Sequence, residues 1–158
     1  MRYNKEHFSS YYNEISAILR NFKLPTWEEF PDIELYMDQM TVLINRYLAI
    51  GDGEPEKTVT ASMINNYVKM RIMPPPIKKK YNRTHLAYLV VICSLKDPLG
   101  ISAIEKLFPL ELEGEILRDR YNSFVINQQK AYHFVADNVD SVALPLFEEQ
   151  ARISDRIY

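Results

Sequence analysis

Apolar residues recur at the three- and four-residue spacing of an amphipathic helix along most of the chain, whereas the alternation typical of strands is scarce. The first such segment spans residues 11–22, and the clearest spans residues 33–50, where Asp32 is a suitable N-cap. Its apolar positions are Ile33, Tyr36, Met37, Met40, Leu43, Ile44, Tyr47 and Leu48. Between the two helices, Thr26 can cap a short turn that Pro31 closes.

A helix predicted over residues 61–71, with Thr60 as N-cap, has two faces of different character. The apolar face carries Met63, Ile64, Tyr67 and Val68. The opposite face carries Ser62, Asn65, Asn66 and Lys69. The spacing therefore predicts a helix that packs on a core with one side and presents four polar side chains to solvent.

Three consecutive prolines at positions 74–76 cannot continue this helix and predict an extended segment. After them, three lysines stand between Ile77 and Tyr81. We interpret residues 77–81 as a short strand or wing tip that is anchored by the apolar residue at each end.

The following helix, which Asn82 can cap, is apolar on nearly all sides from Leu86 to Leu95, so we expect it at the centre of the core. Ser102 and Glu105 have capping-box spacing and predict a short helix that ends near Phe108.

A longer helix is predicted over residues 112–136. Its apolar stripe comprises Leu117, Tyr121, Phe124, Gln128, Ala131 and Val135, widened by Val125 and Tyr132. Leu144, Leu146 and Phe147 predict a last short helix. The expected fold is all-α with a small β-wing, in three segments: N-terminal helices (residues 1–56), a central segment (57–108) and a C-terminal helical region (109–158).

Composition places the 158-residue chain among globular proteins, because 47% of its residues are apolar and 25% are charged. The single cysteine, Cys93, excludes a disulfide within the chain and a cysteine-based metal site, and its apolar helix predicts a buried, unreactive thiol. No apolar run is long enough to span a bilayer, so we expect a cytoplasmic protein without a membrane partner.

Catalytic motifs are absent from the sequence. His7, His85 and His133 are scattered, and there is neither a phosphate-binding loop nor a nucleophile elbow. His85 stands at the start of the predicted core helix, where packing or capping is the expected role. We therefore expect no enzymatic activity, no cofactor and no metal.

Charge is distributed unevenly although the net charge is only −2. The stretch from Lys57 to Lys96 contains 8 basic residues and no acidic residue, while the remainder has 11 basic and 21 acidic residues. A basic block in an otherwise acidic chain is typical of a surface that binds a polyanion.

The pattern suits duplex DNA, because an exposed helix fits the major groove and asparagine can bond adenine through two atoms. Ser62, Asn65, Asn66 and Lys69 would then face bases. The expected phosphate contacts are Lys69, Arg71, Lys78, Lys79, Lys80 and Arg83. The alternative is a protein-interaction adaptor whose basic face binds an acidic partner.

Two stretches of this region resemble the DNA-binding module of MerR-type winged helix-turn-helix regulators. They are TASMINNYVKMRIMP at residues 60–74 and KYNRTHLAYL at residues 80–89, followed by LGIS at residues 99–102. The resemblance implies a recognition helix, a basic wing and a core helix. It also implies double-stranded DNA as partner and a homodimer paired through a later helix, and it identifies no effector.

The sequence departs from the MerR-type pattern at three points. Asn65 or Asn66 stands where an arginine is usual, the wing lacks its glycine, and a loop of about eight residues replaces the usual three- or four-residue turn. A closer resemblance, to the bacterial family called domain of unknown function 1836, covers roughly residues 24–108. It rests on LPTW at residues 24–27, IELYMDQ at residues 33–39, and the stretch from Met63 to Tyr81.

Overall fold

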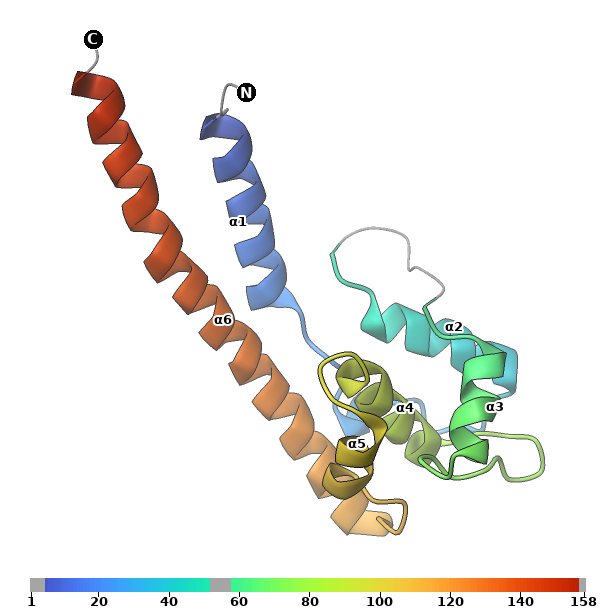
Figure 1. Cartoon of the computed structure of the whole chain (residues 1–158). Helices are drawn as coiled ribbons and strands as arrows, with labels where there is room; N and C mark the ends of the chain where they lie inside the picture. The colour runs from blue at the N-terminus through green and yellow to red at the C-terminus, as the bar shows by residue number, and fades with distance from the viewer. Residues whose placement is uncertain (1–4, 52–57, 157–158) are drawn as a thin grey trace. The chain divides into compact units, whose positions relative to one another are not determined.

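The computed structural model describes residues 5–51 and 58–156, with side chains for residues 9–51 and 58–145. This part of the chain is mostly helical, as predicted (Figure 1). In chain order the elements are α1 (Lys5–Asn21), the 3₁₀ turn η1 (Trp27–Glu29), α2 (Met37–Leu48), α3 (Ala61–Lys69), α4 (Arg83–Leu95), α5 (Ile101–Leu107) and α6 (Gly114–Arg156). None of the helices in these described ranges is both long and apolar enough to cross a membrane.

The chain divides into two units, and α6 contributes to both. Unit 1 contains α1 and the part of α6 from Asn127 onward, whereas unit 2 extends from Leu24 to Ile126. These two units differ from the three segments expected from the sequence, 1–56, 57–108 and 109–158. Each expected segment is continuous in sequence, whereas unit 1 joins residues from both ends of the chain.

The core of unit 2 is built around α4, as the sequence predicted. Every residue from His85 to Ile92 is buried, because α4 carries apolar side chains on nearly all sides. The helix α2 packs against both α4 and α3. The helix with the strongest apolar run, α4, is therefore the element on which the rest of unit 2 packs.

The first turns of α6 close this core through Tyr121, which is fully buried. Its ring packs on that of Phe30 with centroids 5.1 Å apart, and its hydroxyl donates to the Pro25 carbonyl oxygen at 2.8 Å. The next residue, Asn122, accepts a hydrogen bond from the Trp27 backbone N–H at 2.8 Å. These contacts attach the segment around η1 to α6.

The start of α2 corrects the sequence prediction. The helix begins at Met37 and not at Ile33, so Asp32 is not its N-cap. Leu35 instead forms an isolated antiparallel bridge with Tyr81, with two backbone hydrogen bonds of 2.8 Å. Leu35 and Tyr81 are both buried, and this pairing outside the helix is a non-local interaction that a helical periodicity cannot reveal.

Two further helix boundaries also differ from the prediction. The N-cap of α5 is Gly100, so Ser102 does not form the predicted capping box. The helix α6 continues without interruption to Arg156, with Pro145 inside it, so the predicted separate short helix is part of α6. The side chains of Leu146 and Phe147 lie outside the described residues.

Unit 1 is a helical hairpin in which α1 and the later part of α6 run antiparallel (Figure 1). The Phe22 ring packs on Tyr132 with centroids 5.2 Å apart, whereas Tyr12, earlier in α1, donates its hydroxyl to Asp140, later in α6. The predicted stripe is confirmed at Leu117, Tyr121 and Val125, which are buried. It is wrong at Ala131 and Val135, which are exposed; Ala136 is buried there instead.

His85 joins the start of α4 to the proline segment. The Asn82 backbone N–H donates to His85 Nδ1 at 2.9 Å, so the ring proton is on Nε2, which lies 2.9 Å from the Pro75 carbonyl oxygen. The predicted capping role is thus confirmed. Burial lowers the pKa of His85, although its hydrogen bond to Pro75 acts in the opposite direction.

We predict that His85 makes the protein less stable in mild acid. Because its pKa is lowered on folding, the unfolded chain takes up a proton first as the pH falls below about 6.5. Stability is therefore lost between that pH and the lower pKa of the folded state, by at most about 1.4 kcal/mol per pH unit. Urea unfolding at several pH values between about 7.5 and 5.5 measures this slope.

The variant His85→Gln should reduce the slope, because it removes the group whose pKa is lowered on folding. Equal slopes for the wild type and His85→Gln would contradict the assignment.

Candidate functional site

The predicted polar face of α3 is confirmed. Ser62, Asn65, Asn66 and Lys69 are all exposed, and no other part of the described chain covers them. Thr60 is the N-cap, as predicted, and its hydroxyl oxygen accepts from the Met63 backbone N–H at 3.3 Å. The helix ends at Lys69, two residues earlier than predicted, so Arg71 lies just beyond it.

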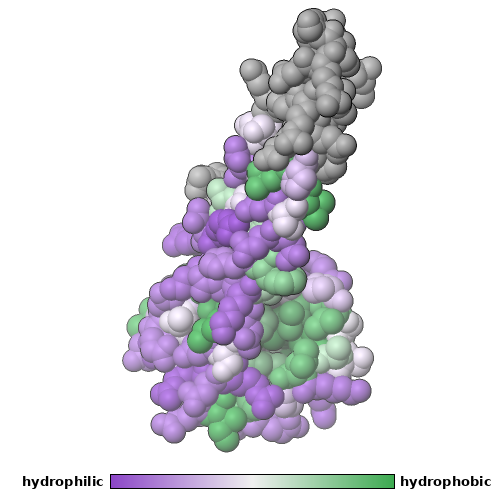
Figure 2. All heavy atoms as spheres, turned by 90° about the vertical axis from the view of Figure 1, so that its left-hand side faces the viewer, coloured by the Kyte–Doolittle hydropathy of each residue, from purple (hydrophilic) through white to green (hydrophobic). Residues whose placement is uncertain are grey.

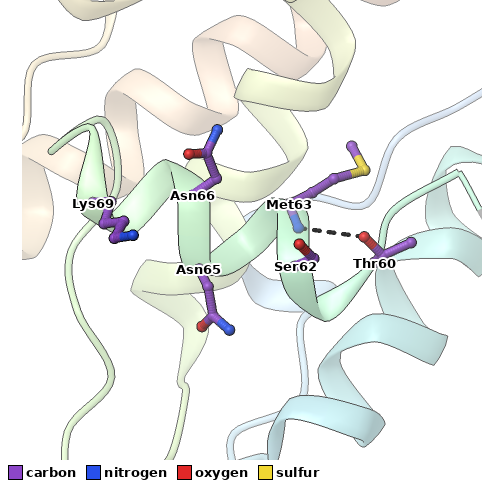
Figure 3. Close-up of a pocket in the computed structure, with 6 residues that line it drawn as sticks. All are labelled: Thr60, Ser62, Met63, Asn65, Asn66 and Lys69. Atoms are coloured by element: carbon purple, nitrogen blue, oxygen red, sulfur yellow. Dashed lines mark hydrogen bonds between the residues drawn. The ribbon is translucent and has the colours of Figure 1, made fainter.

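An open depression of about 740 Å³ lies along this face. Its lining is formed by Thr60, Ser62, Met63, Asn65, Asn66 and Lys69. Figure 3 shows the two asparagines extending from opposite edges of the helix, with Ser62 and Lys69 on either side of them along its length. The arrangement offers amide donors and acceptors, a hydroxyl and an ammonium group within about two helical turns.

The inner face fixes α3 on unit 2. Ile64 is fully buried, and Tyr67 is buried as well. Burial, together with the nearby Cys93 and Asp97, raises the pKa of Tyr67 to about 12, so its hydroxyl stays neutral. The polar face can therefore interact with a partner without loss of the packing that holds the helix.

Asn45 on α2 holds the chain just before α3. Its Oδ1 accepts from the Val59 backbone N–H at 2.8 Å and from the Thr58 hydroxyl at 3.0 Å. Its Nδ2 donates to the Val59 and Thr41 carbonyl oxygens, both at 2.9 Å. One buried amide thus satisfies both backbone groups of Val59, next to the N-cap of α3.

The sequence analysis did not identify Asn45. It is a polar residue between the apolar positions Ile44 and Tyr47 of a strongly amphipathic helix. A polar side chain beside an inward-facing position is a weak signal by itself, because its partners at Thr58 and Val59 become neighbours only in the folded protein.

The three lysines form a tight turn, here called the basic turn (residues 77–80). Ile77 and Lys80 exchange two backbone hydrogen bonds of 3.0 Å, and Lys78 and Lys79 lie between them with φ of 50° and 63°. Two central residues with positive φ are characteristic of a type I′ turn. Figure 1 shows the segment between α3 and α4 extending outward from the end of α3.

The anchors of the basic turn are only partly those predicted. Tyr81 is buried, but the side chain of Ile77 is 58% exposed, so its predicted role as an anchor is wrong. Ile77 is held instead by backbone hydrogen bonds, whereas Tyr81 is fixed by its bridge to Leu35 and by the edge of the His85 ring, 5.2 Å away.

The left-handed backbone at the basic turn is unusual for lysine. Type I′ turns favour Asn-Gly, since positive φ crowds the Cβ of other residues and costs about 1 kcal/mol per residue. Within residues 5–51 and 58–156, the non-glycine residues with positive φ are Arg71, Lys78 and Lys79. All three are exposed and cationic.

Two of the predicted phosphate contacts already have partners within the protein. The ammonium group of Lys80 lies 3.4 Å from a Glu34 carboxylate oxygen and 5.7 Å from the centroid of the Tyr36 ring. Arg83 donates two hydrogen bonds to the Phe30 carbonyl oxygen, at 2.9 and 3.2 Å. Arg83 therefore links the η1 segment to α4, and its phosphate contact stays a prediction that this geometry does not favour.

Cys93 has the properties of a structural thiol. It is only half-buried as a residue, but burial raises the pKa of its thiol to about 11, so the group stays protonated at neutral pH.

Comparison with protein families assigns the chain to one family. The model of the family described as domain of unknown function (DUF1836) matches residues 25–134, which is more than half of the chain, so the protein belongs to this family. No curated protein and no solved structure shows a significant match.

We predict that Asn45→Ala lowers the free energy of unfolding by about 2–4 kcal/mol, because it leaves the buried N–H and carbonyl of Val59 without partners. Urea denaturation followed by circular dichroism measures the change. The matched substitution Asn65→Ala, at an exposed asparagine, should stay within about 0.5 kcal/mol of the wild type. Similar small effects for both variants would show that Asn45 does not hold the chain before α3.

Proposed function

We propose that this member of the DUF1836 family is a transcriptional regulator that binds double-stranded DNA. In this proposal the polar face of α3 contacts base edges in the major groove. The basic turn and Arg71 contact the phosphate backbone. In this proposal the module acts as a MerR-like winged helix-turn-helix, and the basic turn takes the role of the β-wing.

The observation that carries the proposal is the coincidence of backbone strain and positive charge. Arg71, Lys78 and Lys79 adopt a conformation that glycine or asparagine would adopt more easily. Lysines contribute nothing to a type I′ turn that Asn-Gly would not provide. Strained residues are characteristic of functional sites, and the property these three share is a cationic side chain exposed to solvent.

The chemistry of α3 favours a nucleic-acid duplex over a general anion. Asn65 and Asn66 can each donate and accept, which suits the N6 and N7 atoms of adenine, and Ser62 can pair with either kind of group. Lys69 adds a charge at the end of the face. The protein contacts that hold α3 use its other side, so its docking needs no rearrangement of unit 2.

One copy of the chain offers few phosphate contacts, and its specific affinity should accordingly be modest. We expect two copies to act together on neighbouring half-sites, as is usual for helix-turn-helix proteins.

We predict that Lys78→Asn with Lys79→Gly separates stability from binding. The Asn-Gly turn relieves the positive-φ strain, so the free energy of unfolding should rise by about 0.5–1 kcal/mol. The affinity for duplex DNA should fall, and the log-log slope of affinity against salt should decrease in magnitude by about 1.8 for two lost phosphate contacts. Fluorescence anisotropy with a random duplex measures both quantities.

The control for this experiment is Lys106→Asn with Lys130→Asn, which removes the same charge from exposed positions on α5 and α6. It should leave the salt slope nearly unchanged. An equal loss for both double variants would show that only net charge matters. No binding of duplex by the folded wild type would refute the proposal and favour the adaptor that binds an acidic protein.

We predict a different effect for Asn65→Ala with Asn66→Ala. Base contacts determine sequence preference, so this variant should lose discrimination between selected and random duplexes, by about 1–3 kcal/mol for each good contact. The salt slope should be retained, because no phosphate contact is removed. Selection of bound sequences from a random pool, followed by anisotropy, measures the change; unaltered discrimination would exclude α3 as the reading element.

A further inference from the structure

The helical hairpin of unit 1 has one charged side. Arg20 on α1 pairs with Asp137 at 2.9 Å and with Asp140 at 2.6 Å, both on α6. His133, one turn before Asp137, has its Nε2 atom 3.0 Å from the Arg20 carbonyl oxygen. These contacts place Arg20, Asp137 and Asp140 on a common side of the hairpin.

The opposite side of the same hairpin is apolar. Successive helical residues are about 100° apart, so Val135 and Asp137 lie on either flank of the buried Ala136. In the same way Ile18 and Arg20 lie on either flank of Leu19 on α1. Because Arg20 and Asp137 meet on one side of the antiparallel pair, Ile18 and Val135 lie together on the other side.

Helical spacing extends this side into two rows. The row on α1 is Tyr11, Ile15, Ile18 and Phe22; the row on α6 is Gln128, Ala131, Val135, Val139 and Val142. Ile15 is 50% exposed and Val142 is 66% exposed. Figure 2 shows hydrophobic residues interrupting the polar surface of the described part of this unit.

We propose that a second copy of this chain covers the apolar side of the hairpin, forming a four-helix bundle from two hairpins. The inference deepens the homodimer expected above but does not depend on DNA binding. Both rows lack charged residues, so two identical surfaces can meet about a two-fold axis without like-charge repulsion. The two rows would then form the interior of the bundle.

The charges favour this occupant over others. A nucleic acid or a charged protein would find no complementary charge in these two rows. A membrane-surface helix usually has a polar face rich in lysine and arginine, whereas the charged side here carries Asp137 and Asp140 beside Arg20. A second hairpin needs only apolar area, which both copies provide.

Sedimentation equilibrium of the full chain without DNA tests the proposal. The wild type should have twice the 18.6 kDa mass of one chain. Val135→Lys with Val142→Lys should be monomeric, because it buries two ammonium groups per copy in the interface. Asn138→Lys with Ser141→Lys adds the same charge to exposed positions outside the valine row of α6 and should remain dimeric.

If the lysine variant loses helical circular dichroism signal, a near-isosteric variant tests the same interface. Val135→Thr with Val142→Thr should weaken dimerisation at least tenfold, because hydroxyl groups enter an apolar interface. A monomeric wild type, or a dimer whose affinity neither valine variant changes, would overturn the proposal. A monomer that binds vesicles would identify a membrane surface instead, and a monomer that still binds duplex DNA would refute the dimer while leaving the proposed DNA function intact.

Discussion

Complete burial of α4 is the constraint on which the arrangement of unit 2 depends. A helix that is apolar on nearly all sides is stable in water only when other elements cover it. In this protein α2 packs against α4, and the buried face of α3 completes the covering near Tyr67 and Cys93. The polar face of α3 is exposed because the opposite face is needed to cover the core.

A few hydrogen-bonded contacts fix the orientation of the exposed segments on this core. Asn45 fixes Val59 immediately before α3, and His85 fixes the proline segment immediately before the basic turn. Tyr81 fixes the other end of that turn through its bridge to Leu35. Each of these contacts joins residues that are ten or more positions apart in sequence, so the position of each exposed group depends on the fold of unit 2.

The two units show how one helix can serve two purposes. The first turns of α6 complete a conventional core through Leu117, Tyr121 and Val125. Within unit 1 the later turns pair with α1, and a pair of helices has too little interior to bury both of its sides. The charged pairing of Arg20 with Asp137 occupies one side, and the valine row is left on the other.

Local spacing and local hydrogen bonds were enough to predict the helical class, the two faces of α3, the central position of α4 and the caps at Thr60 and Asn82. The sequence also located the basic residues of the candidate site. The later start of α2, the exposure of Ile77 and the hydrogen bonds from Arg83 to Phe30 could be seen only in the folded chain. For the start of α2 and for Arg83 the deciding partner is remote in the chain, and a non-local contact leaves no periodic trace in a single sequence. The positive φ of Lys78 and Lys79 belongs to the same class, since the ends of their turn are held by residues whose positions only the folded chain defines.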